Sequence, residues 1–357
     1  MHPFVYNYRR KPFPQELELS IPAIQKARIG AYIMRNLLAG RQRFPLVLML
    51  EPLFRCNLRC NGCGKIAYPE DVLSRRLSVE ECVSAAEECG APVVSIAGGE
   101  PLLHPDIASV VGEITARKRF VYLCTNALLV EKQLGEFSPS PYLTFNLHLD
   151  GMRERHDSLV CCQGVFDKAV SAIRLLVSRG YRVTTNTTFF GGETPESAAR
   201  FFDFLTSLGV EGMTVSSGFG YESAADQGNF LGRDGTKELF RRVFEIGRGR
   251  DWKFNHSSLY LEFLAGNEKY ACLPWANPTR NVFGWQRPCY LLSDGYAVTY
   301  KELLETTAWE RYGTGKDPRC ADCMVHCGFE PSAVMDSVRH PLKAFLSHVR
   351  GVDSGKR

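Results

Sequence analysis

The sequence has little of what marks membrane-spanning, secreted or nucleic-acid-binding proteins. No stretch approaches the run of about 18 apolar residues that a transmembrane helix needs. The first residues lack an apolar segment before a small-residue cleavage site, so no signal peptide is predicted. The net charge is only +4, which gives no reason to expect a nucleic-acid partner. We therefore expect a cytoplasmic globular protein.

Cysteine, in contrast, is plentiful. The chain of 357 residues has 13 cysteines, an odd number, and no visible export signal, which argues against a disulfide framework. Three cysteines fall between Cys56 and Cys63, and three more between Cys320 and Cys327. This clustering favours thiolates that bind metal in a reducing compartment.

After Pro45 the sequence alternates between strand and helix patterns, which predicts βαβ units around a parallel sheet. The predicted strands cover residues 46–52, 93–98, 120–126, 143–150, 182–189 and 213–217. Helices are expected near 78–90, 105–118, 164–179, 195–208 and 235–250. We predict an α/β fold, a partial (β/α)6 TIM-like barrel, with a smaller cysteine-containing C-terminal region.

This pattern divides the chain into three regions. Residues 1–44 form an N-terminal arm followed by an amphipathic helix, 45–220 the barrel core, and 221–357 the C-terminal region with a candidate auxiliary metal site. The helix near 24–40 carries several basic residues. It is either a packing helix or a peripheral contact with the inner face of a membrane.

Polar residues alternate along two of the strands, which places them on one face. In the fourth strand this face holds Thr144, Asn146, His148 and Asp150, and the fifth strand repeats it with Asn186. A purely structural barrel would fill its interior with branched apolar residues instead. The polar face therefore predicts a bound polar ligand.

Cys56, Cys60 and Cys63 form a C-x3-C-x2-C motif on the loop after the first strand, the catalytic end of a βα unit. Three thiolates suit three irons of a [4Fe–4S] cluster and leave the fourth iron open. The alternatives are a zinc site, which normally has four protein ligands when structural, and reduced core cysteines.

This spacing resembles the radical S-adenosylmethionine (SAM) superfamily, and Gly98-Gly99-Glu100-Pro101 after the second strand resembles its GGEP motif. The resemblance implies that SAM binds the open iron and is cleaved to a 5′-deoxyadenosyl radical. It also makes Gly98, Gly99 and Glu100 contacts of the methionine part. His148, Asp150 and Asn186 are candidate contacts of the ribose or adenine, although His148 and Asp150 could instead bond each other. One position departs from the family: Gly62 stands where many members have an aromatic residue.

Several longer blocks are similar to the adenosylhopane synthase family of hopanoid biosynthesis. They include Leu50–Cys56, Gly62–Ile66, Gly90–Leu103, Val121–Leu129, Asn277–Leu292 and Cys320–Cys327. The resemblance implies addition of the 5′-deoxyadenosyl radical to the terminal alkene of a hopene (diploptene), with a flavodoxin or ferredoxin as electron donor. It also implies that Cys124 donates hydrogen to the resulting tertiary carbon radical. On position alone, Cys124 is more readily explained as a buried small residue.

A second metal site is expected in the C-terminal region. Cys289, Cys320, Cys323 and Cys327 could hold an auxiliary [4Fe–4S] cluster or a zinc ion, with Cys272 as a substitute ligand, or remain free thiols. Two other functions stay open: a SPASM-type radical SAM enzyme that modifies a peptide, and a non-enzymatic metal-binding scaffold. The aromatic residues near the strand ends are either hydrocarbon contacts or core.

Overall fold

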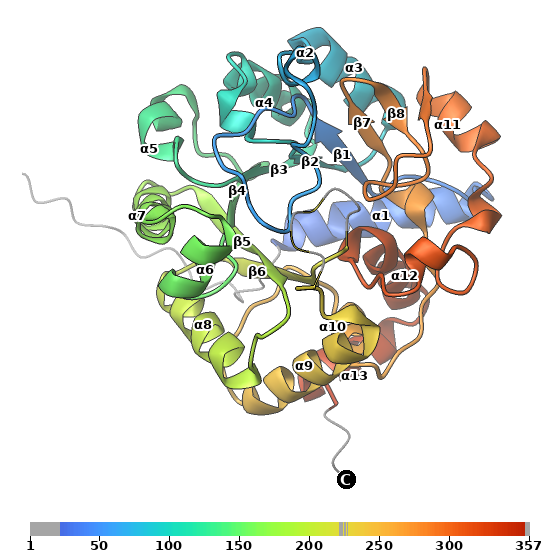
Figure 1. Ribbon diagram of the computed structural model, residues 1–357. Helices are drawn as coiled ribbons and strands as arrows, with labels where there is room; N and C mark the ends of the chain where they lie inside the picture. The colour runs from blue at the N-terminus through green and yellow to red at the C-terminus, as the bar shows by residue number, and fades with distance from the viewer. Residues whose placement is uncertain (1–21, 221–223, 225, 227, 354–357) are drawn as a thin grey trace, which may run out of the picture.

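The computed structural model describes residues 22–220, 224, 226 and 228–353 (Figure 1). All but the last residue of the predicted N-terminal arm, 1–22, lies outside the described residues. The predicted helix that follows it is present as α1 (Ala23–Leu38).

One curved sheet organises the molecule. Its parallel strands, in chain order, are β1 (Val47–Glu51), β2 (Val93–Ile96), β3 (Phe120–Thr125), β4 (Leu143–His148), β5 (Arg182–Phe189) and β6 (Gly212–Ser217). Each pairs with the next, and β6 and β9 form the two ends of an open strand order. The prediction of a partial barrel of six βα units is therefore confirmed.

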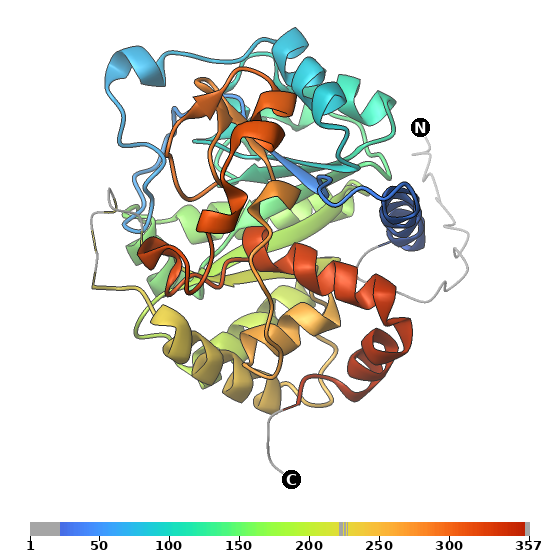
Figure 2. The same cartoon turned by 90° about the vertical axis from the view of Figure 1, so that its right-hand side faces the viewer.

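Helices cover the outer face of this sheet (Figures 1 and 2). The longer ones are α3 (Val79–Cys89), α4 (Ile107–Ala116), α7 (Val165–Ser178) and α8 (Pro195–Ser207), while the short helices α2 (Glu70–Leu73), α5 (Val130–Gln133) and α6 (Arg153–Leu159) stand in the connections that follow β1, β3 and β4. Local sequence sets several of their ends. Ser78 and Glu81 form a capping box at the start of α3, and Gly90 ends it in the left-handed conformation.

The C-terminal region extends the same sheet. Three short strands, β7 (Thr279–Asn281), β8 (Gly284–Gln286) and β9 (Tyr296–Ala297), continue it beyond β1. The sequence analysis did not predict them, because runs of two or three residues carry no usable periodicity. The helices here are α9 (Gly232–Ile246), α10 (Ser258–Leu264), α11 (Tyr300–Thr306), α12 (His326–Arg339) and α13 (Pro341–Arg350). The boundaries of the three regions stay predictions.

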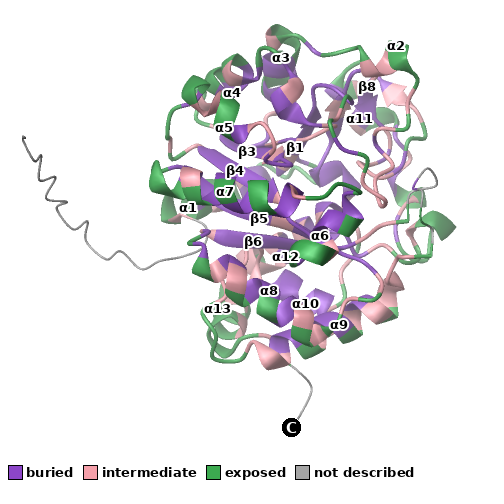
Figure 3. Cartoon of the chain, turned by 60° about the vertical axis from the view of Figure 1, so that its left-hand side comes forward, coloured by how far each residue is buried: buried purple, intermediate pink, exposed green. Residues whose placement is uncertain are grey.

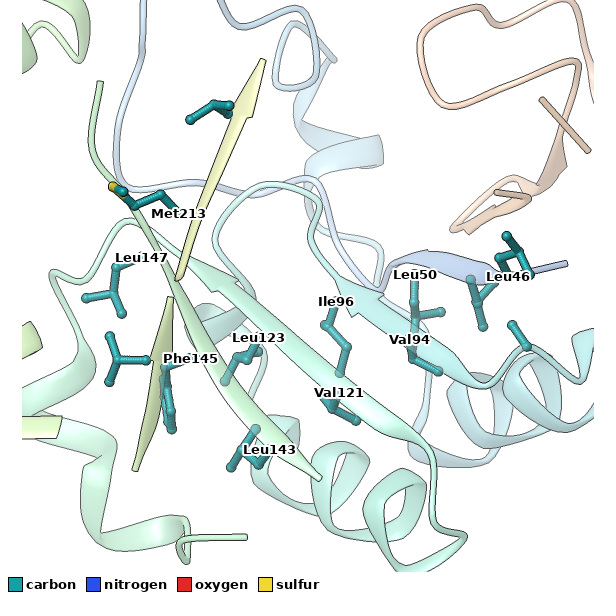
Figure 4. Close-up of a cluster of buried hydrophobic side chains, with 14 of the residues drawn as sticks. Leu46, Leu50, Val94, Ile96, Val121, Leu123, Leu143, Phe145, Leu147 and Met213 are labelled. Carbon is teal, nitrogen blue, oxygen red and sulfur yellow. The ribbon is translucent and has the colours of Figure 1, made fainter. Parts of the chain in front are cut away.

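The two faces of the sheet differ as the alternation predicts. Phe145 and Leu147 of β4 are buried among the core side chains between sheet and helices, together with residues of the neighbouring strands (Figure 4). Across the molecule, the strands are mostly buried and the exposed residues lie on the outer faces of the helices (Figure 3). The polar residues of β4 and β5 point to the other side, where the cavity described next is found. Among the described residues, no helix combines the length and apolarity needed to cross a bilayer.

Candidate active site

A cavity of about 310 Å³ lies at the carboxyl ends of the parallel strands. Its wall includes almost every residue that the sequence analysis proposed for the site. They are Cys56, Cys60, Cys63, Gly98, Gly99, Glu100, Cys124, Asn146, His148, Asp150 and Asn186. Residues from five different strands or strand ends thus converge on one space, as expected where parallel strands end together.

The three cysteines of the motif are partly buried in this wall. Backbone N–H groups of Leu58 and Lys65 donate to the sulfurs of Cys56 and Cys63, each at 3.4 Å. Burial raises the pKa of Cys56 to about 11, and the charges of Glu100 and Cys63 add to this shift. Burial likewise raises the pKa of Cys60, and the neighbouring charges of Cys63 and Asp150 raise it further. Three adjacent thiolates therefore need a cationic group between them.

This donor set fits the iron–sulfur cluster. Soft sulfur ligands suit iron, and the amide hydrogen bonds to sulfur are the contacts that tune such clusters. Each cysteine of a [4Fe–4S] cube binds its own iron, so the three sulfurs need not share one ion. Among the described residues there is no group of three or more His, Cys, Asp or Glu side chains arranged to hold a single metal ion.

Gly98 and Gly99 have a role that the sequence analysis did not foresee. A Cβ atom at either position would clash with backbone carbonyl oxygens of the cysteine loop, at Leu53 for Gly98 and at Phe54 and Arg55 for Gly99. Gly99 N–H donates to Leu53 O at 3.0 Å. The glycines are needed because β2 packs its end directly against the cluster loop, whether or not they also contact SAM.

Glu100 links two strand ends. Its carboxylate accepts hydrogen bonds from Thr125 Oγ1 at 2.7 Å, Asn126 N at 2.8 Å and Leu102 N at 3.0 Å. Burial raises the pKa of Glu100, while these donors lower it. The side chain is therefore fixed in place at the cavity wall, where it can accept one further bond from a ligand cation.

His148 and Asp150 bond each other, as one alternative in the sequence analysis expects. His148 Nε2 lies 2.6 Å from Asp150 Oδ2, and Thr188 N–H donates to the other carboxylate oxygen at 2.7 Å. Burial is the largest influence on the pKa of His148 and lowers it, but the charge and hydrogen bond of Asp150 together with the charge of Glu100 outweigh burial, so the net shift is upward. Both side chains still line the cavity, so mutual bonding does not remove them as ligand contacts.

Cys124 stands at the end of β3 in the same cavity. Its sulfur lies 3.5 Å from Ser95 Oγ and accepts from Asn146 Nδ2 at 3.5 Å. Burial raises its pKa, which outweighs the two hydrogen bonds that lower it. The thiol therefore keeps its hydrogen at neutral pH, which is the form that a hydrogen-atom donor requires.

An aromatic ring lies next to Gly62. The ring of Phe190, just after β5, lies 2.5 Å from where a Cβ of residue 62 would stand, and it also lines the cavity. Phe190 thus occupies the place of the aromatic side chain that the cysteine motif lacks. No local signal in the sequence could have paired residues 62 and 190, because the contact depends on the fold.

Other cavity residues were also missed. Ser95 occupies the polar position of β2 and was detectable from the strand alternation, but Tyr290 and His326 come from the C-terminal region. Lys65, just beyond the cysteine motif, pairs with buried Glu51 at 3.3 Å and lies 4.1 Å from the centre of the Tyr290 ring. The C-terminal region thus closes one side of the cavity.

The C-terminal cysteines meet around a second, much smaller cavity of about 30 Å³. Its wall contains Cys272, Cys289, Cys320, Cys323 and Cys327, so the four predicted ligands and the predicted substitute come together. Burial raises the pKa of Cys272 well above its usual value, and the charges of the other four cysteines add to the shift. Cys327 lines both cavities.

Comparisons with known proteins agree with this geometry. The Radical SAM superfamily model matches residues 50–205, and a model described as a domain of unknown function, DUF3463, matches 213–347. GTP 3',8-cyclase 1 of Mycobacterium tuberculosis is 22% identical over 322 residues, covering 84% of this chain and 78% of that protein. Mycofactocin maturase MftC of Mycolicibacterium smegmatis is 29% identical over 141 residues, covering 38% of this chain and 36% of that protein.

Solved structures show the same fold. SuiB of Streptococcus suis superposes with a TM-score of 0.64 at 17% identity, over 83% of this chain and 76% of that one. The native anSMEcpe structure with bound AdoMet and a peptide gives 0.59 at 16% identity, over 85% and 99% of the two chains. Radical SAM proteins use a [4Fe–4S] cluster and SAM, and the cysteine loop and polar cavity found here suit both. Residues 50–205 therefore belong to the radical SAM superfamily, and the site that they form is that of a radical SAM enzyme.

Proposed function

We propose that this enzyme adds the 5′-deoxyadenosyl radical of SAM to the terminal alkene of a hopene and that Cys124 completes the reaction. The observation that carries the proposal is the position of Cys124. A neutral thiol, held by Ser95 and Asn146, lies in the same cavity as the three cysteines of the cluster loop. An enzyme that only abstracts hydrogen from its substrate has no need of a second hydrogen donor there.

In this proposal the chain's residues divide into three groups. Cys56, Cys60 and Cys63 hold the [4Fe–4S] cluster, which supplies the electron that cleaves SAM to methionine and the radical. Glu100 and the His148–Asp150 pair hold the polar parts of SAM, and Asn186 contributes a further polar contact. Phe190 packs beside the cysteine loop, where a flat ring can stack on the adenine.

The reaction balances as an addition followed by hydrogen transfer. The 5′-carbon forms a bond with the terminal alkene carbon, and the unpaired electron moves to the adjacent tertiary carbon. That carbon takes the hydrogen atom of the Cys124 S–H bond, which is the weaker of the two bonds, and a sulfur radical remains. One electron from a flavodoxin- or ferredoxin-type donor and one proton from water restore the thiol.

The size of the cavity limits how the hydrocarbon enters. At about 310 Å³ it lies at the lower end of the roughly 300–1,000 Å³ range of ligand pockets. SAM fills much of that volume, so we expect only the alkene end of the hopene to enter beside it. Apolar side chains at the wall, among them Leu58, Leu159, Phe219, Leu291 and Val325, suit such a group.

A second candidate is modification of a peptide, and the comparisons reported above support it better. One SuiB structure is described as bound to its precursor peptide SuiA, and it superposes over 91% of this chain with a TM-score of 0.61. The anSMEcpe structure also contains a peptide. None of the relatives reported above is named as a hopanoid enzyme. The resemblance of several sequence blocks to the adenosylhopane synthase family and the position of Cys124 are the arguments for the hopene.

Anaerobic incubation of the iron-reconstituted protein with SAM, a reductant and diploptene tests the choice. Mass spectrometry should detect a saturated adenosyl adduct. Cys124→Ala should still cleave SAM but lose the saturated product at least about 100-fold, whereas Cys162→Ala, which removes an exposed cysteine, should behave as wild type. A normal yield from Cys124→Ala would refute the role of that thiol.

The remaining outcomes separate the alternatives. SAM cleavage to 5′-deoxyadenosine without any diploptene adduct would favour modification of a peptide. The next experiment would then be a search for a peptide that accelerates SAM cleavage. Absence of SAM cleavage under reducing conditions would leave only the metal-binding scaffold.

A further inference from the structure

Helix α1 carries an apolar stripe on the side that faces away from the protein. Ile24, Met34 and Leu38 are 47%, 45% and 83% exposed, and Ala27 and Ala31 lie between them at helical spacing. Its buried side is partly polar: Gln25 is 2% exposed and donates to Tyr122 OH, and Asn36 is equally buried. The buried side also contains Ile33, which is fully buried, so α1 has apolar residues on both sides, unlike an ordinary amphipathic surface helix.

The last helix, α13, also has an exposed apolar stripe. Leu342, Phe345, Leu346 and Val349 are 69%, 61%, 37% and 65% exposed and follow the i, i+3, i+4, i+7 spacing of one helix face. The helix contacts the protein through its small residues instead. Ser258 Oγ donates to Ala344 O at 3.1 Å, and Ser347 Oγ donates to a Glu262 carboxylate oxygen at 3.4 Å.

Both stripes lie on one side of the molecule. In Figures 2 and 3, α1 and α13 occupy the same flank, and α12 contacts both helices. Arg28 of α1 donates to Lys118 O, just before β3, so this flank is at the amino ends of the strands. The active-site cavity is at their carboxyl ends.

A cationic hollow of about 540 Å³ borders the stripe of α1. Its charged lining residues are Arg28, Arg35, Arg117, Lys118 and Arg119, and no acidic residue lines it. Arg117 is neutralised by Glu87 and Glu113, but for the other four, among the described residues, no ion pair is found. The Nε of Arg119 is buried and, within the same part of the chain, has no hydrogen-bond partner.

We propose that this flank binds the surface of a membrane rich in anionic phospholipids. Exposed apolar side chains beside a group of cations are what an interfacial helix presents, since the apolar groups enter the acyl boundary and the cations meet the phosphates. A second copy of the chain fits less well, because a symmetric dimer across this flank would bring like charges together. The active-site cavity lies at the opposite ends of the strands, so this surface attaches the enzyme and does not deliver substrate.

Vesicle sedimentation with the full chain tests this directly. The protein should sediment with vesicles of phosphatidylcholine containing phosphatidylglycerol, less so at high salt, and poorly with phosphatidylcholine alone. Arg28→Glu with Arg35→Glu should lower the partition coefficient at least about tenfold, because each cation at such a surface contributes about fivefold. Phe345→Ser with Val349→Ser should lower it about tenfold with the salt dependence unchanged.

Lys168→Glu with Arg174→Glu is the matched control. It makes the same change in charge at exposed positions of α7 and should bind like wild type. Unchanged circular dichroism and unfolding temperature show that each variant folds. The proposal is wrong if the full chain does not sediment with anionic vesicles, or if the control variant loses binding as much as the test variants. It is also wrong if the test variants instead dissociate a dimer that sedimentation velocity detects in the wild type. None of these readouts uses SAM or a hopene, so the result is independent of the proposed function.

Discussion

The two cysteine groups of this enzyme differ in how the chain builds them and in the space they surround. Cys56, Cys60 and Cys63 come from one loop and open onto a cavity of about 310 Å³. The five C-terminal cysteines come from separate segments and enclose about 30 Å³. A metal centre that performs chemistry needs an open coordination position, whereas one that serves structure or electron transfer does not. The difference supports the proposal that the first group, and not the second, takes part in radical generation.

A buried cation stands between the two groups. The charge of Lys65 lowers the pKa of Cys63 in the first group, and of Cys289 and Cys327 in the second, although burial dominates all three shifts and raises them. Lys65 is held by Glu51, whose side chain is fully buried. The ammonium group thus favours the thiolate state of cysteines in both groups.

The largest expected loss of activity comes from a substitution in the first group, Cys56, Cys60 and Cys63. Cys60→Ala removes one of three cluster ligands, so the cluster should not assemble there and SAM cleavage should fall to background, a loss of at least about 1,000-fold. Cleavage is measured as 5′-deoxyadenosine formed under reducing, oxygen-free conditions. The exposed Cys162→Ala variant serves as control. Substantial cleavage by Cys60→Ala would contradict the assignment of the first group.

The sequence predicts part of the active site, namely the residues that follow local patterns. The strand alternation around Asn146 and His148 and the cysteine spacing are local patterns, and both placed residues correctly at the cavity wall. The position of Tyr290 at the cavity wall beside Lys65, and that of the Phe190 ring next to Gly62, bring together residues more than a hundred positions apart. They depend on the sheet that positions them, and a single sequence carries no periodic signal for such contacts.

For Gly98 and Gly99, the sequence predicted the residues but not the physical reason for them. The motif was recognised from its residues, but the reason for its glycines appeared only when the cluster loop was seen to pack against them. The cysteines at 272 and 289 are similar: they were counted as candidates, yet only the fold brings them to Cys320, Cys323 and Cys327.

A smaller loss of activity is expected from a substitution in the second group, the five C-terminal cysteines. If it holds a second [4Fe–4S] cluster, wild-type protein should contain about eight irons per chain and Cys323→Ser about four. The variant should unfold at a lower temperature, because metal binding contributes to the stability of a folded site, and should retain much of its SAM cleavage. A chain lacking Cys56, Cys60 and Cys63 supplies the complementary measurement. Absence of residual iron and zinc from that chain would rule out the second site.

The smallest effect should come from a substitution of Phe190, whose ring lies beside Gly62. This substitution tests whether SAM binds next to the first cysteine group as proposed. Phe190→Leu keeps an apolar side chain but removes the flat surface, so the affinity for SAM should fall about 2- to 10-fold, the value of one aromatic contact. Phe137→Leu is a suitable control, because that ring packs against Phe145 in the core and does not line the cavity. The measurement is SAM titration of the reconstituted cluster, followed by its electron paramagnetic resonance spectrum. If both variants bind SAM like wild type, then Phe190 only fills the space above Gly62, and the adenine is held by other residues.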